Sequence, residues 1–241
     1  TFLTGDYRPA FDGADFSFNN SWEQFDGTNW NAVAPSPQSL AALNTPPSRI
    51  IIDKQFITGG GNSQYRYNDI IVLSGADLTF NDDDATPASE IINASRRIEV
   101  LDGGQFVLQG DMDLPSTGNL IVRSGGEMVI NQASIVNNHP MWDGVELFEG
   151  GSTVTINDWN WTASPTVASL VNIATAITSN ANGYKFGNLV VDVNTTANWN
   201  IIGGGIGVIN LVENNFDISN ASTFWITGAT NATGTNGYVV N

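Results

Sequence analysis

The sequence has 241 residues, 41% of them hydrophobic, so the chain is long enough to bury a core and does not have the composition of a disordered protein. Eight Lys and Arg face 24 Asp and Glu. The resulting formal charge of −16 excludes a nucleic-acid binder and disfavours an anionic membrane surface. Cysteine is absent, which excludes disulfides, zinc–thiolate sites and thiol catalysis, and no apolar run approaches the roughly 18 residues of a membrane span. Charged residues total only 13%, while Asn, Thr, Ser and Gly abound, so we expect short strands and tight turns rather than amphipathic helices.

The first 48 residues differ from the rest in being rich in Asp, Asn, Pro and aromatic residues, as in Trp22–Trp30 and Pro35–Pro37. A stacked β-structure needs its first layer covered, because an open end exposes core and unpaired strand edges. Five aromatic side chains of this segment suit that role: Phe16, Phe18, Trp22, Phe25 and Trp30. We therefore interpret residues 1–48 as an N-terminal capping segment for the repeats that follow.

Four later segments share one pattern of apolar, any, apolar, two residues, Gly, a small residue, apolar, any, apolar, amide. They are residues 70–81, 98–109, 120–131 and 145–157, the last with one extra residue after its glycines. Ile70 and Val72 alternate as one strand face, and Leu78 and Phe80 as another. Between the two strands lies a glycine, which reaches backbone conformations that other residues adopt only with strain. These glycines are Gly75, Gly103, Gly125 and Gly150.

The repeat spacing predicts a coil rather than a meander. The four glycines are 28, 22 and 25 residues apart. A hairpin meander reverses direction at each strand, whereas units of equal sense with a step of about 22 residues predict one coil of three short strands each. Weaker copies extend the series at Ile50–Asp53, Val167–Ile177, Leu189–Val193 and Ile209–Val212. We predict an all-β chain in which residues 49–241 form a right-handed parallel β-helix (solenoid) of about eight rungs, with an N-terminal cap over residues 1–48.

An amide ends the repeat pattern in each clear unit. The residues are Asn81, Gln109, Asn131 and, after the extra residue, Asn157. Stacked amides hydrogen-bond along the axis of repeated β-structures, which predicts a ladder here. The alternative interpretation is that Asn simply favours turns.

The motifs resemble those of a known group of proteins. The run Trp22–Trp30, the Pro-rich link, Ile50–Asp53 and Val72–Phe80 resemble the opening of large secreted surface proteins of Bacteroidota, and Met141–Val145 is similar to their right-handed β-helix regions. The resemblance implies export to the extracellular cell surface, often by the type IX secretion system and as part of a long adhesin, with roles in attachment or gliding motility. It implies no catalytic residues, because the matched motifs are architectural. The sorting domain of such proteins is not visible, so either it lies beyond Asn241 with further modules of the same chain, or the export assignment is wrong.

Consecutive acids make the best candidate for a metal site. Asp82, Asp83 and Asp84 supply the hard oxygen ligands that Ca²⁺ prefers, although the standard helix–loop–helix spacing is missing. A solvated acidic turn is the alternative. Asp12, Asp15 and Asp26 form a second, weaker candidate. We expect no required cofactor, with calcium as the one candidate ligand.

Trp159 and Trp161 are the candidates for ligand binding. Two tryptophans separated by one residue share a face of a strand. If that face points outward, it offers a platform on which sugar rings stack. If it points inward, the tryptophans belong to the core.

Catalytic groups are sparse. Arg97 and Arg123 fall on successive repeats but at different repeat positions, and His139, the single histidine, has no triad partner at a recognisable spacing. Three carboxylates flank the glycine corners, where solvation is the simpler interpretation: Asp102, Glu127 and Glu149. We therefore expect a non-catalytic extracellular structural or adhesion module, whose partners are a polysaccharide or protein of the cell surface or matrix. The alternatives are a carbohydrate-binding β-helix and a polysaccharide lyase or glycoside hydrolase.

Overall fold

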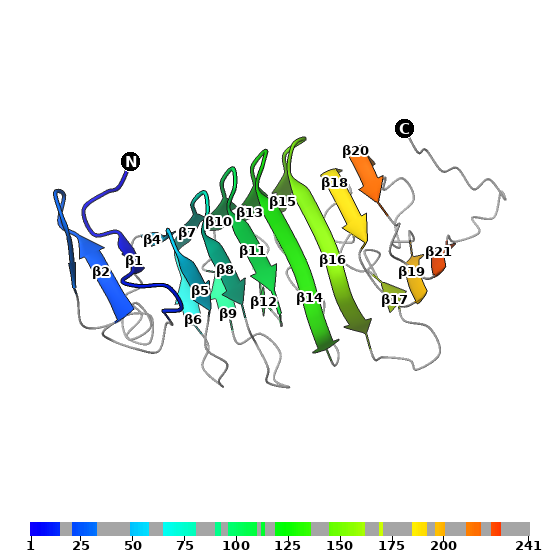
Figure 1. Cartoon of the computed structure of the whole chain (residues 1–241), viewed down its shortest axis with the longest axis horizontal. Coiled ribbons are helices and arrows are strands. Elements are labelled where there is room, and N and C mark those ends of the chain that lie inside the picture. The colour runs from blue at the N-terminus through cyan, green and yellow to red at the C-terminus, as the bar shows by residue number, and fades with distance from the viewer. Residues whose placement is uncertain are drawn as a thin grey trace.

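In a computed structural model, the structure describes residues 1–14, 21–32, 49–57, 65–80, 90–92, 96–109, 112–113, 119–135, 145–161, 169–170, 185–191, 196–200, 211–217 and 223–227. These residues form strands and turns, and no α-helix occurs among them. Within the same ranges, no helix is long and apolar enough to cross a membrane. The all-β class expected from the composition is therefore confirmed (Figure 1).

The largest sheet has eight strands in the order β15-β13-β10-β7-β4-β1-β2-β3. Its strands are β1 (Tyr7–Pro9), β2 (Trp22–Phe25), β3 (Trp30–Ala32), β4 (Arg49–Ile52), β7 (Asp69–Val72), β10 (Arg97–Val100), β13 (Asn119–Val122) and β15 (Val145–Phe148). From β4 to β15 every pairing is parallel, and β1 also joins β4 in parallel. The antiparallel pairs described in this sheet are β1 with β2 and β2 with β3.

A second sheet has seven strands, all parallel, in the order β20-β18-β16-β14-β11-β8-β5. They are β5 (Gln55–Ile57), β8 (Asp77–Phe80), β11 (Gln105–Leu108), β14 (Glu127–Ile135), β16 (Thr153–Trp161), β18 (Lys185–Val191) and β20 (Leu211–Asp217). Figure 1 shows this sheet running along the length of the molecule, with β14 and β16 as its longest strands.

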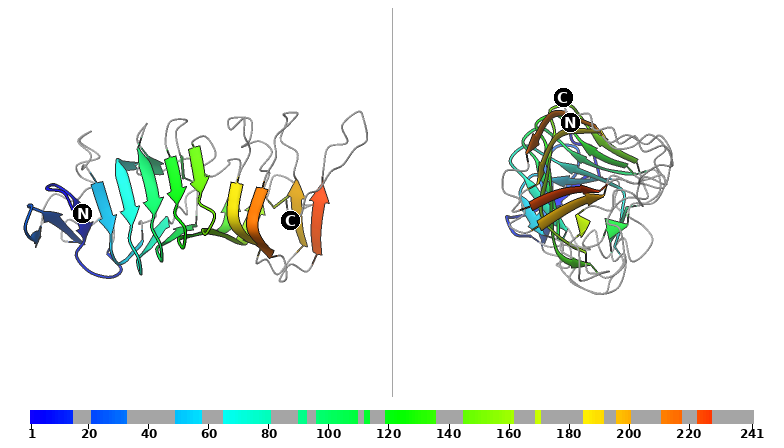
Figure 2. Two further views of the ribbon diagram at one scale, coloured as in Figure 1. Left: turned by 90° about the horizontal axis from the view of Figure 1, so that it is seen from above. Right: turned by 90° about the vertical axis from the view of Figure 1, so that its right-hand side faces the viewer.

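Two smaller parallel sheets complete the described structure. One joins β6 (Tyr65–Tyr67), β9 (Glu90–Ile92) and β12 (Met112–Asp113), and the other joins β17 (Ser169–Leu170), β19 (Thr196–Asn200) and β21 (Thr223–Thr227). From β4 to β12 the chain visits three sheets in a fixed order, one strand in each, and then repeats. Each strand therefore lies beside the strand one repeat later, and the strands stack along the long axis (Figure 2).

Apolar side chains at equivalent positions form continuous interior rows. Alternate residues of a strand point to opposite faces of its sheet, so in-register stacking brings like beside like. One buried row of the eight-stranded sheet is Ile50, Ile70, Ile98 and Leu120. The matching row of the seven-stranded sheet is Phe56, Leu78, Phe106, Met128, Val154 and Leu189. Burying each such side chain contributes on the order of 1.5–3 kcal/mol, so these rows are a main source of stability.

Glycine corners connect the two long sheets, as the repeat pattern predicts. Gly75, Gly103 and Gly125 have φ of 76°, 71° and 79°, a region that residues with a Cβ enter at a cost. Their backbones are also hydrogen-bonded from corner to corner. The N–H of Gly75 donates to the carbonyl of Gly103 (2.8 Å) and that of Gly103 to the carbonyl of Gly125 (2.9 Å). The corners thus continue the ladder of the strands.

The structure shifts the predicted position of the fourth corner glycine by one residue. The N–H of Gly125 donates to the carbonyl of Gly151 (2.9 Å), so Gly151, not Gly150, is equivalent to the other corner glycines. The prediction that Asn157 continues the amide series is also wrong. A register shift follows Ile130, and Asn131 pairs with Asp158. Such a bulge adds one residue to one strand, and only the pairing reveals it. Asn81, the first predicted amide, lies outside the described residues.

A small residue comes just before β8, β11, β14 and β16, and Gly187, inside β18, occupies the same register. The row is Ala76, Gly104, Gly126, Ser152 and Gly187. A Cβ on Gly187 would lie 2.5, 2.7 and 2.8 Å from the carbonyl oxygens of Glu149, Ser152 and Gly150. These are backbone atoms, so the crowding cannot be relieved by turning a side chain.

We predict that Gly187→Ala lowers the free energy of unfolding by about 1–3 kcal/mol, because its methyl group overpacks this carbonyl cluster. Ser152→Ala is the matched control. It lies at the same register and removes a buried hydroxyl without a hydrogen-bond partner in the described part of the chain. Its stability should be unchanged or higher by up to about 1 kcal/mol. Urea denaturation measures both, and equal midpoints for the two variants would contradict the prediction.

Candidate functional site

The residues chosen from sequence for ligand binding and metal binding are only partly described. Trp159 and Trp161 lie in β16, where their backbones pair with Gln132 and Ile135 of β14 across a register shift. Their role in carbohydrate binding stays a prediction. Five other candidates lie outside the described residues: Asp15, Asp82, Asp83, Asp84 and His139. The described residues contain no group of three His, Cys, Asp or Glu arranged to hold a metal ion.

Arg97 and Arg123, candidates on successive repeats, meet at one carboxylate. Arg97 opens β10 opposite Asn119, whereas Arg123 follows the end of β13, so they occupy different repeat positions, as the sequence indicates. Both nevertheless contact Glu99, which is 8% exposed. The Arg123 guanidinium lies 2.6 Å from Glu99 Oε1, and Arg97 Nε lies 3.1 Å from Oε2.

Glu149 extends this group of charges to a third strand. Its Oε1 accepts from Arg123 Nη1 at 2.6 Å, and its Oε2 accepts from the backbone N–H of Ser124 at 3.0 Å. The Ser124 N–H, and then the Arg123 guanidinium, hold the pKa of the Glu149 carboxyl below its usual range. A general acid needs a raised pKa, so this environment suits Glu149 to ion pairing rather than to proton donation. We call Arg97, Glu99, Arg123 and Glu149 the central charge cluster.

The other two corner carboxylates have separate surroundings. Glu127 lies at the start of β14 on the outward face of the seven-stranded sheet. It accepts hydrogen bonds from Gln105 Nε2 (2.9 Å) and Thr155 Oγ1 (2.8 Å), one on each neighbouring strand. Asp102 lies in the turn between β10 and β11 and is exposed, with its carboxylate over Gly125 of the next corner. Asp102, Glu127 and Glu149 lie beside the glycine corners, as the sequence predicts, but each contacts a different set of neighbouring residues.

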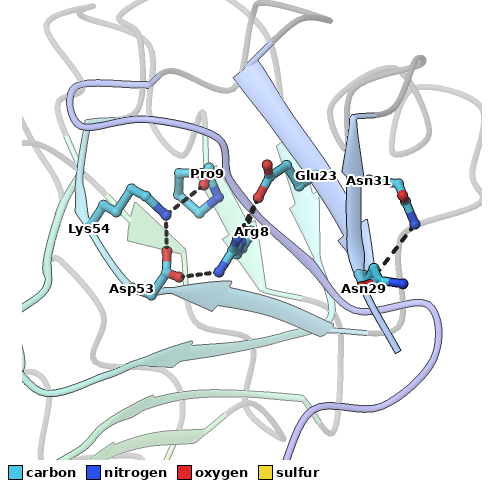
Figure 3. Close-up of polar contacts among 7 residues, drawn as sticks. All are labelled: Arg8, Pro9, Glu23, Asn29, Asn31, Asp53 and Lys54. Carbon is cyan, nitrogen blue, oxygen red and sulfur yellow. Dashed lines mark hydrogen bonds and ion pairs between the residues drawn. The ribbon is translucent and has the colours of Figure 1, made fainter. Parts of the chain in front are cut away.

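A second charge cluster, which sequence reasoning missed, lies near the N-terminus. Arg8 of β1 donates from Nε to Glu23 Oε2 of β2 (2.7 Å) and from Nη1 to Asp53 Oδ2 after β4 (3.0 Å), as Figure 3 shows. Lys54 Nζ donates to Asp53 Oδ1 (2.9 Å) and to the carbonyl oxygen of Pro9 (3.2 Å). The Arg8 guanidinium also stacks 4.4 Å from the centre of the Trp30 ring. Because partners are up to 45 residues apart, no local sequence pattern reveals this cluster.

A buried ion pair lies beside this cluster. Asp6 is fully buried, and it accepts from Arg49 Nε at 2.8 Å and from the backbone N–H of Leu3 at 2.7 Å. The hydrogen bond from Arg49 to Asp6 raises the pKa of the Arg49 guanidinium. Asp6 comes just before β1, and Arg49 is the first residue of β4, which pairs with β1. The Asp6–Arg49 ion pair therefore connects the antiparallel strands to the parallel ones.

Asp26, a member of the weaker metal candidate, closes the turn between β2 and β3. Its Oδ1 accepts from the backbone N–H groups of Thr28 and Asn29, both at 2.8 Å, and its Oδ2 accepts from Asn31 Nδ2 at 2.8 Å. These hydrogen bonds, the one from Asn29 first, lower the pKa of Asp26 below its ordinary 3.8. Both carboxylate oxygens of Asp26 thus accept hydrogen bonds from residues 28–31. Asp12, its partner in that candidate, accepts instead from the N–H of Gln55.

The comparisons with known proteins name no relative. No protein-family model, no curated protein and no solved structure matches this chain.

We predict that the β2–β3 turn loosens in acid through Asp26. Its folded pKa is depressed, so its contribution is present above the unfolded value of 3.8 and is lost as pH falls through the lower folded pKa. The Thr28 and Asn29 amides should therefore exchange faster with solvent below that pH. Asp26→Asn should exchange faster already at neutral pH. Asp102→Asn, in a different turn, is the control, and an equal response from both variants would contradict the assignment.

We predict that Arg123→Gln lowers the free energy of unfolding by about 1 kcal/mol, a value kept small because Arg123 is 37% exposed. Ile71 and Ile121 occupy the register of Glu99 on the adjacent strands. Adding Glu99→Ile to Arg123→Gln should therefore recover the loss, since an apolar side chain suits that row. Thermal and urea unfolding test this, and a double variant less stable than Arg123→Gln would refute it.

Proposed function

We propose that residues 49–241 form a right-handed parallel β-helix of about eight rungs, capped by residues 1–48. The support is the repeated visit of the chain to three sheets in a fixed order and the corner-to-corner hydrogen bonds at the glycines. The buried Trp22 ring, 5.1 Å from the ring of Phe56 on the first strand of the seven-stranded sheet, supports the capping role.

On this fold we propose a non-catalytic, extracellular structural or adhesion module, displayed at the cell surface as part of a larger secreted protein. One observation carries the proposal: the residues that recur from repeat to repeat are those that pack against equivalent residues of the neighbouring repeats. The positions that keep one residue type along the described repeats are mostly interior apolar residues and corner glycines, while the outward positions of the seven-stranded sheet vary from strand to strand. A regular stack of this kind suits a spacer or a surface for display.

The location and partners belong to the same proposal. The formal charge of −16 and the lack of cysteine suit a secreted protein stabilised by packing, and the motif resemblance adds export to the bacterial surface, with attachment or gliding motility as roles. The expected partners are a surface or matrix polysaccharide or protein and further modules of the same chain. Asp82, Asp83 and Asp84 are proposed as a calcium site.

Carbohydrate binding is the second candidate function. The observation in its favour is that Trp159 and Trp161 follow a bulge, where β16 shifts its register against β14. Bulges re-aim side chains and gather near binding sites. A polysaccharide lyase or glycoside hydrolase is the third candidate, and the same experiment decides it.

The test is incubation of the purified protein with a panel of neutral and acidic glycans, followed by assays of binding and of chain cleavage. We expect no cleavage product from any glycan, and clear turnover would overturn the structural proposal. If a glycan binds, Trp159→Ala/Trp161→Ala should abolish binding, whereas Phe11→Ala, an exposed aromatic outside β16, should leave it unchanged. Antibody labelling of intact cells of the source organism tests the location, and labelling only after permeabilisation would refute surface display.

A further inference from the structure

The first strands of both long sheets are covered by the N-terminal residues. Strand β1 pairs with β4 through Tyr7 and Ile50. Beside it, the N–H of Gly13 donates to the carbonyl of Gln55 (2.9 Å), and Ala14 forms an isolated parallel bridge with Phe56. Residues 1–14 therefore occupy the edges that β4 and β5 would otherwise present at this end of the molecule, and β2 and β3 continue the eight-stranded sheet beyond β1 (Figure 1).

Strand β4 is a strong template for pairing with another chain. Its sequence places three consecutive isoleucines, Ile50 to Ile52, after Arg49, and all three are buried. An unprotected strand that is apolar on both faces and holds no Pro or Gly pairs readily with a strand of another molecule. The cover on β4 is therefore a protection against association.

Ion pairs hold the covering residues against the β4 segment at both ends of the β1–β4 pairing. Asp6 binds Arg49 on one side, and Arg8 binds Asp53 on the other. Arg8 is held in place within the cover by Glu23 and by the Trp30 ring. We call Asp6, Arg8, Arg49 and Asp53 the clasp.

The pair of Asp6 and Arg49 is the sensitive half of the clasp. Asp6 is fully buried, and among the described residues its cationic partner is Arg49. A buried carboxylate that loses its cation is strongly destabilised and gains by moving into water. Such a movement of Asp6 draws the adjoining Tyr7 away from Ile50.

We propose that residues 1–14 and 21–32 act as a guard over the edge of β4, and that opening the clasp lets the chain pair with a second copy of itself through β4. Two identical edges that pair in antiparallel fashion across a two-fold axis satisfy each other, so the product is a closed dimer rather than a fibre. The proposal depends only on the strand pairings and ion pairs given above, and it stands or falls independently of the proposed function.

The decisive variant is Arg49→Gln, which leaves Asp6 buried without its cation. We expect amide exchange in β1 and β2 to rise by at least about tenfold while β10 and β13 keep their protection. Sedimentation velocity should show a dimer whose fraction grows with protein concentration. Asp6→Asn/Arg49→Gln, a neutral pair that still hydrogen-bonds, should restore both the protection and the monomer.

Arg123→Gln is the matched control, because it removes an ion-paired arginine from the far part of the same sheet. Its small loss of stability should raise exchange by no more than about fivefold, without preference for β1 and β2, and it should sediment as the unmodified protein does. If Arg49→Gln does not fold, the same measurements on Arg8→Gln decide the question, since that change opens the other half of the clasp. In the variant that folds, loosened β1 and β2 without a dimer, or behaviour equal to that of the unmodified protein, would overturn the proposal, as would a loss of protection in β10 and β13 as large as that in β1 and β2.

Discussion

Everything in this structure depends on one constraint, the in-register parallel pairing of each strand with the strand one repeat later. The pairing continues through the corners, where Gly103 accepts from Gly75 and donates to Gly125. Each residue is therefore confined between equivalents about 4.8 Å away on either side. A position tolerates only residue types that stack in such a row. The interior rows from Ile50 to Leu120 and from Phe56 to Leu189 are accordingly apolar, and the row that faces the carbonyls of the preceding corner holds Gly, Ala and Ser.

The same constraint governs the charges of a chain with a formal charge of −16. Stacking would place carboxylates side by side wherever an acid recurs, and like charges directly opposite destabilise a sheet. The outward rows avoid this. Gln105 separates Asp77 from Glu127 on the seven-stranded sheet, and Asp69 lies opposite Arg49 on the eight-stranded one. Hydrogen bonds run along these rows, as from Gln55 to Asp77 and from Gln105 to Glu127. Stacking thus disfavours the recurrence of one acid along an outward row.

The difference between recurring interior positions and outward positions explains which features could be predicted from the sequence. The alternation of apolar residues and the corner glycines are local signals that recur, so the paired strands of the four clear repeats, their parallel sense and three of the four corner glycines could be identified without coordinates. The further rung expected at Val167–Ile177 is wrong, because β16 pairs directly with β18. The fourth unit was misaligned because Val145 and Leu147 alternate as an apolar face, whereas the structure pairs Leu120 with Glu146 and Val122 with Phe148. Nothing in a single strand distinguishes two registers that differ by one residue. Only the partner strand fixes the choice.

The charge clusters were beyond sequence reasoning for a different reason. Arg8 meets Asp53 across 45 residues and Arg123 meets Glu99 across 24, and neither pair forms a spacing motif. Their residues appeared as single surface cations and acids. The candidate ligand sites were chosen instead from composition, as tryptophans and consecutive acids, and they stay predictions.

The ends of such a stack differ physically from its middle. Inside the stack, a strand has a neighbour on each side, and the interior rows of the described residues are filled by buried apolar side chains. At the N-terminal end, β4 pairs with β1, where the sheet changes from parallel to antiparallel pairing, and the ion pairs Asp6–Arg49 and Arg8–Asp53 flank this change. Ion pairs are more easily opened than rows of buried isoleucines, because water competes for their partners. The junction of β1 and β4, where parallel stacking gives way to antiparallel pairing, is therefore held by ion pairs that a single substitution can break.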